Sequence, residues 1–72
     1  MLNLIEQNLF TFIENIRNNP WCPEDLFSTS DYMLELLMAM NNEQDKVVLD
    51  SIRKDFYLYL NKHAKEFEEW II

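Results

Sequence analysis

The fold is decided by the last stretch of the chain, which begins Asn42-Glu43-Gln44-Asp45-Lys46-Val47-Val48-Leu49 and ends Phe67-Glu68-Glu69-Trp70-Ile71-Ile72. This stretch contains neither Gly nor Pro. On a helical wheel, most of its apolar side chains lie on one side. The side chains on that side are Val48, Leu49, Ile52, Phe56, Tyr59, Leu60, His63, Phe67 and Trp70. A period of 3.6 residues is typical of an amphipathic helix. We predict a single helix over about residues 43–71, roughly 42 Å long at ~1.5 Å per residue, which shorter helices must cover.

The N-terminal region predicts a first helix over about residues 3–18. Its apolar side chains recur with a strict spacing of three and four residues, at Leu2, Ile5, Leu9, Phe12 and Ile16, and Ile13 widens the apolar face. Such a narrow apolar stripe is typical of helix bundles. Asn3 and Glu6 have the spacing of an N-terminal capping pair. The helix should end at Asn18-Asn19-Pro20, because the residue before a proline is pushed out of the helical region.

A second helix is predicted over about residues 29–40, with Ser28 or Ser30 as its N-cap. Its main apolar face consists of Met33, Leu36, Leu37 and Met40. Leu34 and Met38 form a second apolar face at a spacing of four residues. A helix that is apolar nearly all round must be buried on more than one side.

The connector over residues 19–28 is expected to be largely non-helical, with one turn from Pro23 to Phe27. Short connections favour helices that run up, down and up. In that arrangement Trp21, Leu26 and Phe27 would shield Phe67 and Trp70 at the end of the third helix. The predicted fold is therefore a single all-α domain over residues 1–72, a small three-helix bundle with a long C-terminal helix.

The length and composition of the chain limit its stability and its setting. A chain of 72 residues buries only about 60% of its unfolded surface, so a homodimer is expected to add stability. Cys22 is the only cysteine, which favours a reducing, intracellular setting. The N-terminus shows no secretory signal, and no apolar run reaches the ~20 residues of a membrane span. We expect a soluble, cytoplasmic protein that does not bind membranes.

The net charge of −7 is unevenly distributed along the chain. Residues 46–72 contain as many basic as acidic residues. Residues 24–45 contain no Lys or Arg but six acids, namely Glu24, Asp25, Asp31, Glu35, Glu43 and Asp45. Such a chain repels phosphate backbones, so direct nucleic-acid binding is not expected.

Two interpretations of these six acids stay open. They could mimic phosphates and inhibit a nucleic-acid-handling complex, as a phage-type counter-defence protein would, because charge complementarity favours such contacts. Alternatively, most of them lie near predicted helix N-termini, where the helix dipole favours carboxylates by about 0.3–1 kcal/mol each.

Residues that could support catalysis are few. His63 is the only histidine, which excludes two-histidine metal sites, and Glu66 lies close enough along a helix to orient it. A general base or a histidine at the edge of the core are both compatible with this position. Cys22 has no cationic neighbour in the sequence to lower its pKa. Because the chain has no Gly, a glycine-rich phosphate loop is excluded. We predict a non-enzymatic protein without a metal or cofactor.

The chain has more apolar surface than one three-helix core can hide. The residues that we predict to bind a partner are Leu34, Met38, Tyr57, Leu58, Trp70 and Ile71, and Leu4 and Phe10 also lie off the first apolar stripe. Exposed patches rich in Met and aromatic residues usually mark protein contacts. The surplus could be covered by a second copy of the chain, by another protein, or by a bent third helix that folds back. The favoured function is a protein-protein interaction module, a small cytoplasmic adaptor or regulator.

Overall fold

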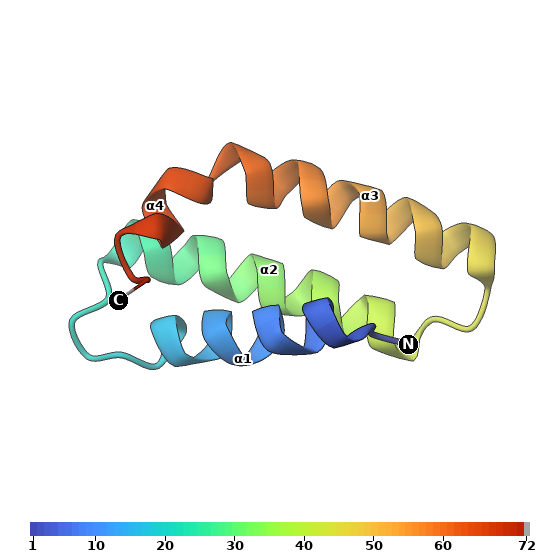
Figure 1. Cartoon of the computed structure of the whole chain (residues 1–72), viewed down its shortest axis with the longest axis horizontal. Coiled ribbons are helices and arrows are strands. Elements are labelled where there is room, and N and C mark those ends of the chain that lie inside the picture. The colour runs from blue at the N-terminus through green and yellow to red at the C-terminus, as the bar shows by residue number, and fades with distance from the viewer. Residues whose placement is uncertain (72) are drawn as a thin grey trace.

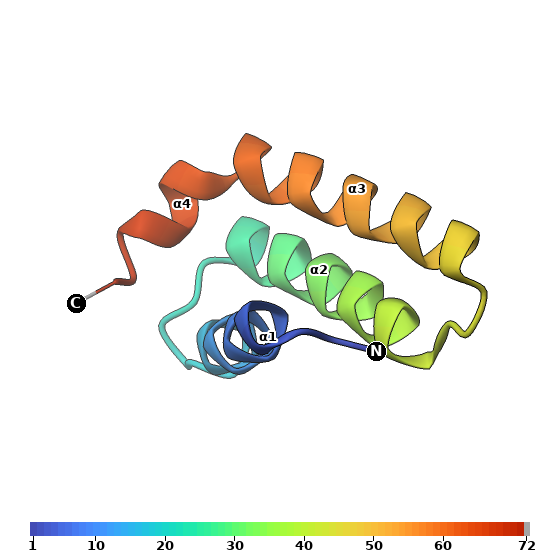
Figure 2. The same cartoon turned by 45° about the vertical axis from the view of Figure 1, so that its right-hand side comes forward.

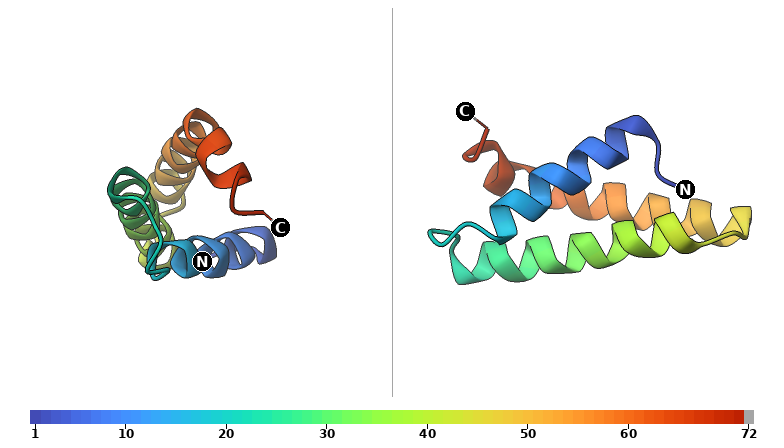
Figure 3. Two further views of the ribbon diagram at one scale, coloured as in Figure 1. Left: turned by 90° about the vertical axis from the view of Figure 1, so that its left-hand side faces the viewer. Right: turned by 90° about the horizontal axis from the view of Figure 1, so that it is seen from below.

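The computed structural model describes residues 1–71 and shows an all-α fold. Its helices are α1 (Leu4–Arg17), α2 (Glu24–Asn42), α3 (Lys46–Lys62) and α4 (Ala64–Glu68). Figure 1 shows α2 lying between α1 and α3, and α1 crosses α2 obliquely when the molecule is turned (Figures 2 and 3). None of the helices within residues 1–71 has the length and apolar character that crossing a membrane requires.

Helix α1 begins as predicted but faces the core differently. The Asn3 side chain accepts a hydrogen bond from the Glu6 backbone N–H, and the Glu6 side chain accepts one from the Asn3 N–H, so the predicted capping pair is confirmed. The predicted apolar stripe is wrong at Ile5, which is 66% exposed. Ile13 and Ile16 are buried as predicted, and Glu6 is buried with them. A carboxylate can take this position because other side chains neutralise it, as described below.

The start of α2 also differs from the prediction. The helix begins at Glu24 directly after Pro23, and it includes the turn that we expected to stand apart in the connector. Proline is well suited to a helix start because it has no N–H that needs a partner. The Phe27 N–H donates to the Pro23 carbonyl, and the Thr29 hydroxyl donates to the Asp25 carbonyl. Residues 24–29 are therefore continuous with the rest of α2. The prediction that Ser28 or Ser30 caps the helix is therefore wrong.

The prediction of one long third helix over residues 43–71 is wrong at both ends. Asp45 caps α3 by accepting hydrogen bonds from the Val47 and Val48 N–H groups, so the helix begins only at Lys46. It ends before His63, whose N–H is shared between the Tyr59 and Leu60 carbonyls. A straight helix of about 42 Å would exceed the longest dimension of the molecule, which is 37 Å. The break at His63 lets α4 turn back over the other helices.

The contact that closes the C-terminal end is not the one predicted. Trp21 is 85% exposed and does not shield Phe67 or Trp70. Phe67 is buried instead against α1, with its ring centroid 6.5 Å from that of Phe12. Trp70, one of the surplus apolar residues, is half-buried against the core, so the folded-back end of the chain covers part of the surplus surface.

The core lies along α2, which supplies most of its side chains. The buried apolar residues are Ile13, Ile16, Leu26, Met33, Leu34, Leu37, Met40, Phe56 and Phe67. The Ser30 hydroxyl is buried among them and has no hydrogen-bond partner within residues 1–71. Because α2 packs against both α1 and α3, it joins these two helices into one core.

Candidate functional site

An open groove of about 430 Å³ lies between α1 and the C-terminal end of α2. Its side chains are apolar or polar without charge, and the residues that line it are Met1, Leu2, Gln7, Phe10, Thr11, Met38, Asn41 and Asn42. Met38 is 51% exposed, whereas Phe10 is half-buried and packs against the core. The groove therefore offers a thioether and an aromatic ring to a side chain that enters from outside.

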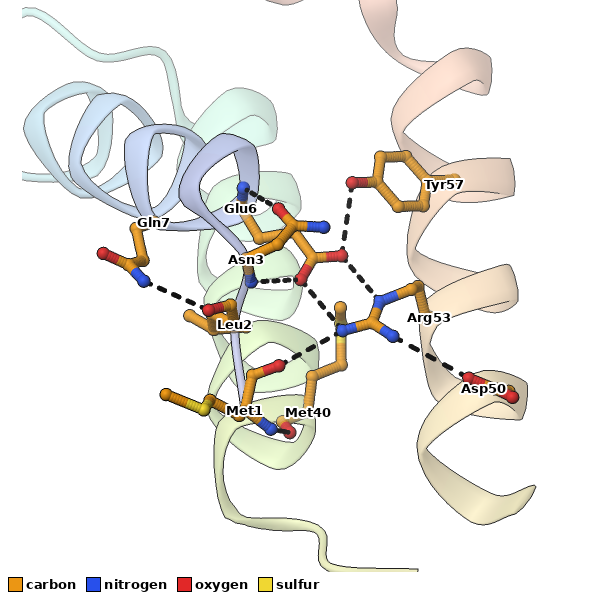
Figure 4. Close-up of polar contacts among 9 residues, drawn as sticks. All are labelled: Met1, Leu2, Asn3, Glu6, Gln7, Met40, Asp50, Arg53 and Tyr57. Atoms are coloured by element: carbon orange, nitrogen blue, oxygen red, sulfur yellow. Dashed lines mark hydrogen bonds and ion pairs between the residues drawn. The ribbon is translucent and has the colours of Figure 1, made fainter. Parts of the chain in front are cut away.

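One wall of the groove is the segment before α1, and hydrogen bonds from three elements fix it. The N-terminal ammonium donates to the Met40 carbonyl of α2 at 3.0 Å. The Gln7 side-chain amide donates to the Leu2 carbonyl at 3.1 Å. From α3, the Arg53 guanidinium donates to the Met1 carbonyl at 3.2 Å. Figure 4 shows these contacts converging on the segment.

Arg53 is held in turn by a buried carboxylate. The Glu6 side chain is fully buried, and it accepts two hydrogen bonds from Arg53, with N–O distances of 2.7 and 3.0 Å. It also accepts a hydrogen bond from the Tyr57 hydroxyl at 3.2 Å and one from the Asn3 N–H at 3.0 Å. We call Asn3, Glu6, Arg53 and Tyr57 the Glu6 cluster (Figure 4). It joins α1 to α3 and orients the guanidinium that holds the groove wall.

The pKa values of the Glu6 cluster reflect this geometry. Burial by itself raises the pKa of a carboxyl group. The hydrogen bonds from Arg53, Asn3 and Tyr57 and the charge of the guanidinium outweigh burial, and they hold the pKa of Glu6 below its ordinary value of 4.5. Burial, followed by the nearby Glu6 charge, raises the pKa of Tyr57 above its ordinary value of 10.0. The cluster is therefore stable with Glu6 ionised and Tyr57 protonated.

We predict that the fold loses stability in acid because of Glu6. A carboxyl group with a lowered folded-state pKa stabilises the fold above its unfolded pKa. That contribution is lost as the pH falls from the ordinary value of 4.5 through the lower folded-state pKa. Urea unfolding from neutral pH downward should show the free energy of unfolding decreasing across this window. In Glu6→Gln the decrease should be smaller, whereas in Glu68→Gln, an exposed control, it should match the unchanged chain. Equal slopes in all three would contradict the role of Glu6.

The residues predicted to bind a partner are not all brought together. Leu34 is buried in the core, and Tyr57 is part of the Glu6 cluster. Trp70 is half-buried beside Phe12 and lines a smaller hollow at the other end of α1. Met38, Leu58 and Ile71 are exposed, but only Met38 lines the groove. Their role in binding a partner stays a prediction.

The acidic residues of the alternative interpretation are spread along α2 and its two ends. Glu24 and Asp25 lie in the first turn of α2. At the opposite end, Asp45 caps α3, and the Glu43 carboxylate accepts a hydrogen bond from the Asp45 N–H. Between the two ends, Asp31 pairs with Arg17 at 2.7 Å, and Glu35 is exposed. The helix dipole at Glu24 and Asp25, the cap formed by Asp45 and the ion pair of Asp31 thus give four of the six carboxylates a structural role.

The two candidate catalytic side chains have ordinary surroundings. His63 Nδ1 lies 3.1 Å from the Glu66 carboxylate, and its ring packs against Tyr59 with centroids 4.5 Å apart. This is a histidine at the edge of the core, at the break between α3 and α4. Burial raises the pKa of the Cys22 thiol, so the reactive thiolate is disfavoured.

Sequence reasoning missed the Glu6 cluster and most of the groove. Glu6 was recognised only as a capping residue, and Arg53 lies on the polar face of α3 in the helical wheel. Within α3, Tyr57 follows Arg53 by four residues and so lies beside it, which was a usable signal for a polar pair. Nothing in the sequence paired either residue with Glu6.

Known proteins give no guide to this site. Comparison of the chain with protein-family models, with curated protein sequences and with solved structures finds no match.

Proposed function

We propose that this protein is a non-enzymatic interaction module, a small cytoplasmic adaptor or regulator that binds another protein in the groove between α1 and α2. The observation that carries the proposal is Met38, an apolar side chain left half-exposed beside Phe10 in a groove of defined shape. Thioether side chains adapt to the surface of a partner, and Met and aromatic residues are enriched at protein contacts.

The groove suits binding because its wall is fixed before a partner arrives. The segment from Met1 to Asn3 is held by Met40, Gln7 and Arg53, so little conformational entropy is lost when a ligand enters. Rigid recognition surfaces gain affinity in this way. By contrast, burial disfavours the reactive thiolate of Cys22, which supports a role without catalysis.

Homodimerisation stays a prediction with less support than the sequence alone suggested. Leu34 was one of the residues expected to need a second copy of the chain, but it is buried by the monomer. The break at His63 also lets α4 fold back, so Phe67 is buried against Phe12 within the monomer. The remaining exposed apolar residues include Met38 on α2 and Leu58 on α3, which belong to different faces of the molecule.

Photo-crosslinking from the groove tests the proposed function. A benzophenone amino acid replaces Met38 in one variant and Leu58, which is 59% exposed but lies outside the groove, in a matched control. Each variant is irradiated in an extract of the cells in which the protein occurs. We expect a discrete adduct with a different protein from position 38 and none from position 58. Identical patterns from both positions would contradict binding in the groove, and an adduct of two copies would assign the groove to a homodimer instead.

A further inference from the structure

We propose that the occupant of the groove is a cationic amphipathic helix, whose large apolar side chain enters between Phe10 and Met38 while its Lys and Arg side chains lie near the surrounding carboxylates. This inference rests on the proposed function and specifies the chemistry of the partner. Three observations support it: the distribution of charge between the two halves of the chain, the carboxylates beside the groove, and the shape of the groove.

All of the net charge of the protein belongs to the half that contains the groove. Residues 1–45, which form α1 and α2, hold eight carboxylates and one arginine, whereas residues 46–72 hold five acids and five bases. That single Arg17 pairs with Asp31 and lies over the Phe27 ring, so its charge is already matched. Arg53 of α3 matches Glu6 in the same way, so the other six of the eight carboxylates have no ion pair within residues 1–71, and they attract cationic partners over a distance.

Carboxylates also flank the groove locally, although none lines it. Glu14 follows Phe10 by four residues on α1, and Glu35 precedes Met38 by three residues on α2, so each lies one turn away on its own helix. Both are exposed. Glu43 follows the lining residue Asn42 directly. An apolar groove with an acidic surround matches a ligand that has an apolar face and basic edges.

The same charges disfavour other occupants. A second copy docked through this face would bring two α1–α2 halves together, each with the net charge of −7, and like charges across an interface are costly. A nucleic acid would be repelled for the same reason. A helix is favoured over an extended strand because a groove between two helices receives side chains spaced by three or four residues, and a groove between helices offers no sheet edge for a strand to pair with.

Three synthetic peptides labelled with a fluorophore test the inference by anisotropy. The first has Leu on one helical face and Lys on the other. The second has Glu in place of every Lys, and the third has the Leu and Lys composition with the face scrambled. We expect the first peptide to bind at least about tenfold more tightly than the other two, since apolar contact and charge must act together. High salt should weaken its binding.

Variants locate the binding of the first peptide. Met38→Ala should weaken it about tenfold, as loss of a central contact does, whereas Leu58→Ala should leave it unchanged. The pair Glu14→Gln and Glu35→Gln should weaken it at low salt. Glu68→Gln and Glu69→Gln, at the end of α4 and its C-cap, remove the same charge elsewhere and should have a much smaller effect. Circular dichroism of each variant confirms that the helices are retained.

The possible outcomes separate this inference from the function on which it rests. If the scrambled peptide binds as tightly as the first peptide, the interaction depends on net charge alone and the inference is overturned. If the Glu peptide binds as tightly as the first peptide, the inference is overturned as well. A partner that crosslinks to position 38 but has no basic helix would overturn the inference and leave the proposed function standing. If position 38 crosslinks no more than position 58, the proposed function itself fails.

Discussion

Arg53→Leu should lower the free energy of unfolding by about 3–5 kcal/mol, which is the usual cost of removing one partner of a buried ion pair. The substitution leaves the fully buried Glu6 carboxylate without its guanidinium, and only Tyr57 and Asn3 remain to bond it. A domain of 72 residues has a total stability on the order of 4–11 kcal/mol. The substitution should therefore remove a large part of that stability.

Denaturation by urea, followed by circular dichroism, measures this effect. Lys54→Leu is the matched control, because Lys54 is the exposed neighbour of Arg53 on α3 and has the same kind of charge. It should change the free energy of unfolding by less than about 0.5 kcal/mol. The double variant Glu6→Leu with Arg53→Leu should recover much of the lost stability, since an apolar pair can replace a buried ion pair. If Arg53→Leu costs no more than Lys54→Leu, the Glu6 cluster does not hold the fold together.

The double variant also separates the two roles of Arg53. It restores a neutral core between α1 and α3, but it cannot restore the hydrogen bond from Arg53 to the Met1 carbonyl. The wall of the groove is then held only by Met40 and Gln7. If the double variant is folded but binds the Leu and Lys peptide more weakly than the unchanged chain does, the wall of the groove has been displaced.

Phe67→Ala is the second substitution with a large expected effect, about 3–5 kcal/mol. Phe67 is 4% exposed and is the only residue of α4 that is buried. A helix of five residues has no stability of its own, so its position depends on the contact of Phe67 with Phe12 and the core. The substitution should release α4 and open the end of the core next to α1.

Thermal unfolding of Phe67→Ala and Trp21→Ala compares two aromatic residues of opposite burial. Trp21→Ala should lie within about 0.5 kcal/mol of the unchanged chain, because Trp21 is almost fully exposed. The original prediction placed Trp21 over Phe67, and in that arrangement both substitutions would be costly. Similar losses for the two variants would therefore favour the predicted contact over the one in the structure.

Local signals in the sequence predicted the local parts of this fold. The spacing of Asn3 and Glu6 predicted the capping pair at the start of α1, and the acidic residues after Asn42 marked the start of α3 to within a few residues. These features depend on neighbours in the chain. The break at His63 has no such signal, because no Gly or Pro lies near it. The break depends instead on the tertiary contact of Phe67 with Phe12 of α1, which the sequence does not reveal.

The candidate site was predictable only in part for the same reason. Leu34 and Met38 occupy one face of α2 by their spacing, so the sequence treats them alike. In the structure Leu34 is buried and Met38 lines the groove. Figure 3 shows that α1 crosses α2 obliquely, so successive turns of α2 have different surroundings. That crossing, like the pairing of Glu6 with Arg53, depends on parts of the chain that are far apart in sequence.

The position of the Glu6 cluster in the chain also has a consequence for the order of folding. Glu6 and Arg53 are 47 residues apart, whereas α2 packs on helices that adjoin it directly in the chain. The entropic cost of closing a loop grows with its length, so contacts between adjacent helices form more readily than distant ones. We expect α2 to assemble with its neighbours first and the bond between α1 and α3 to close last. Because that bond fixes the wall of the groove, we expect the proposed binding site to be complete only in the final step of folding.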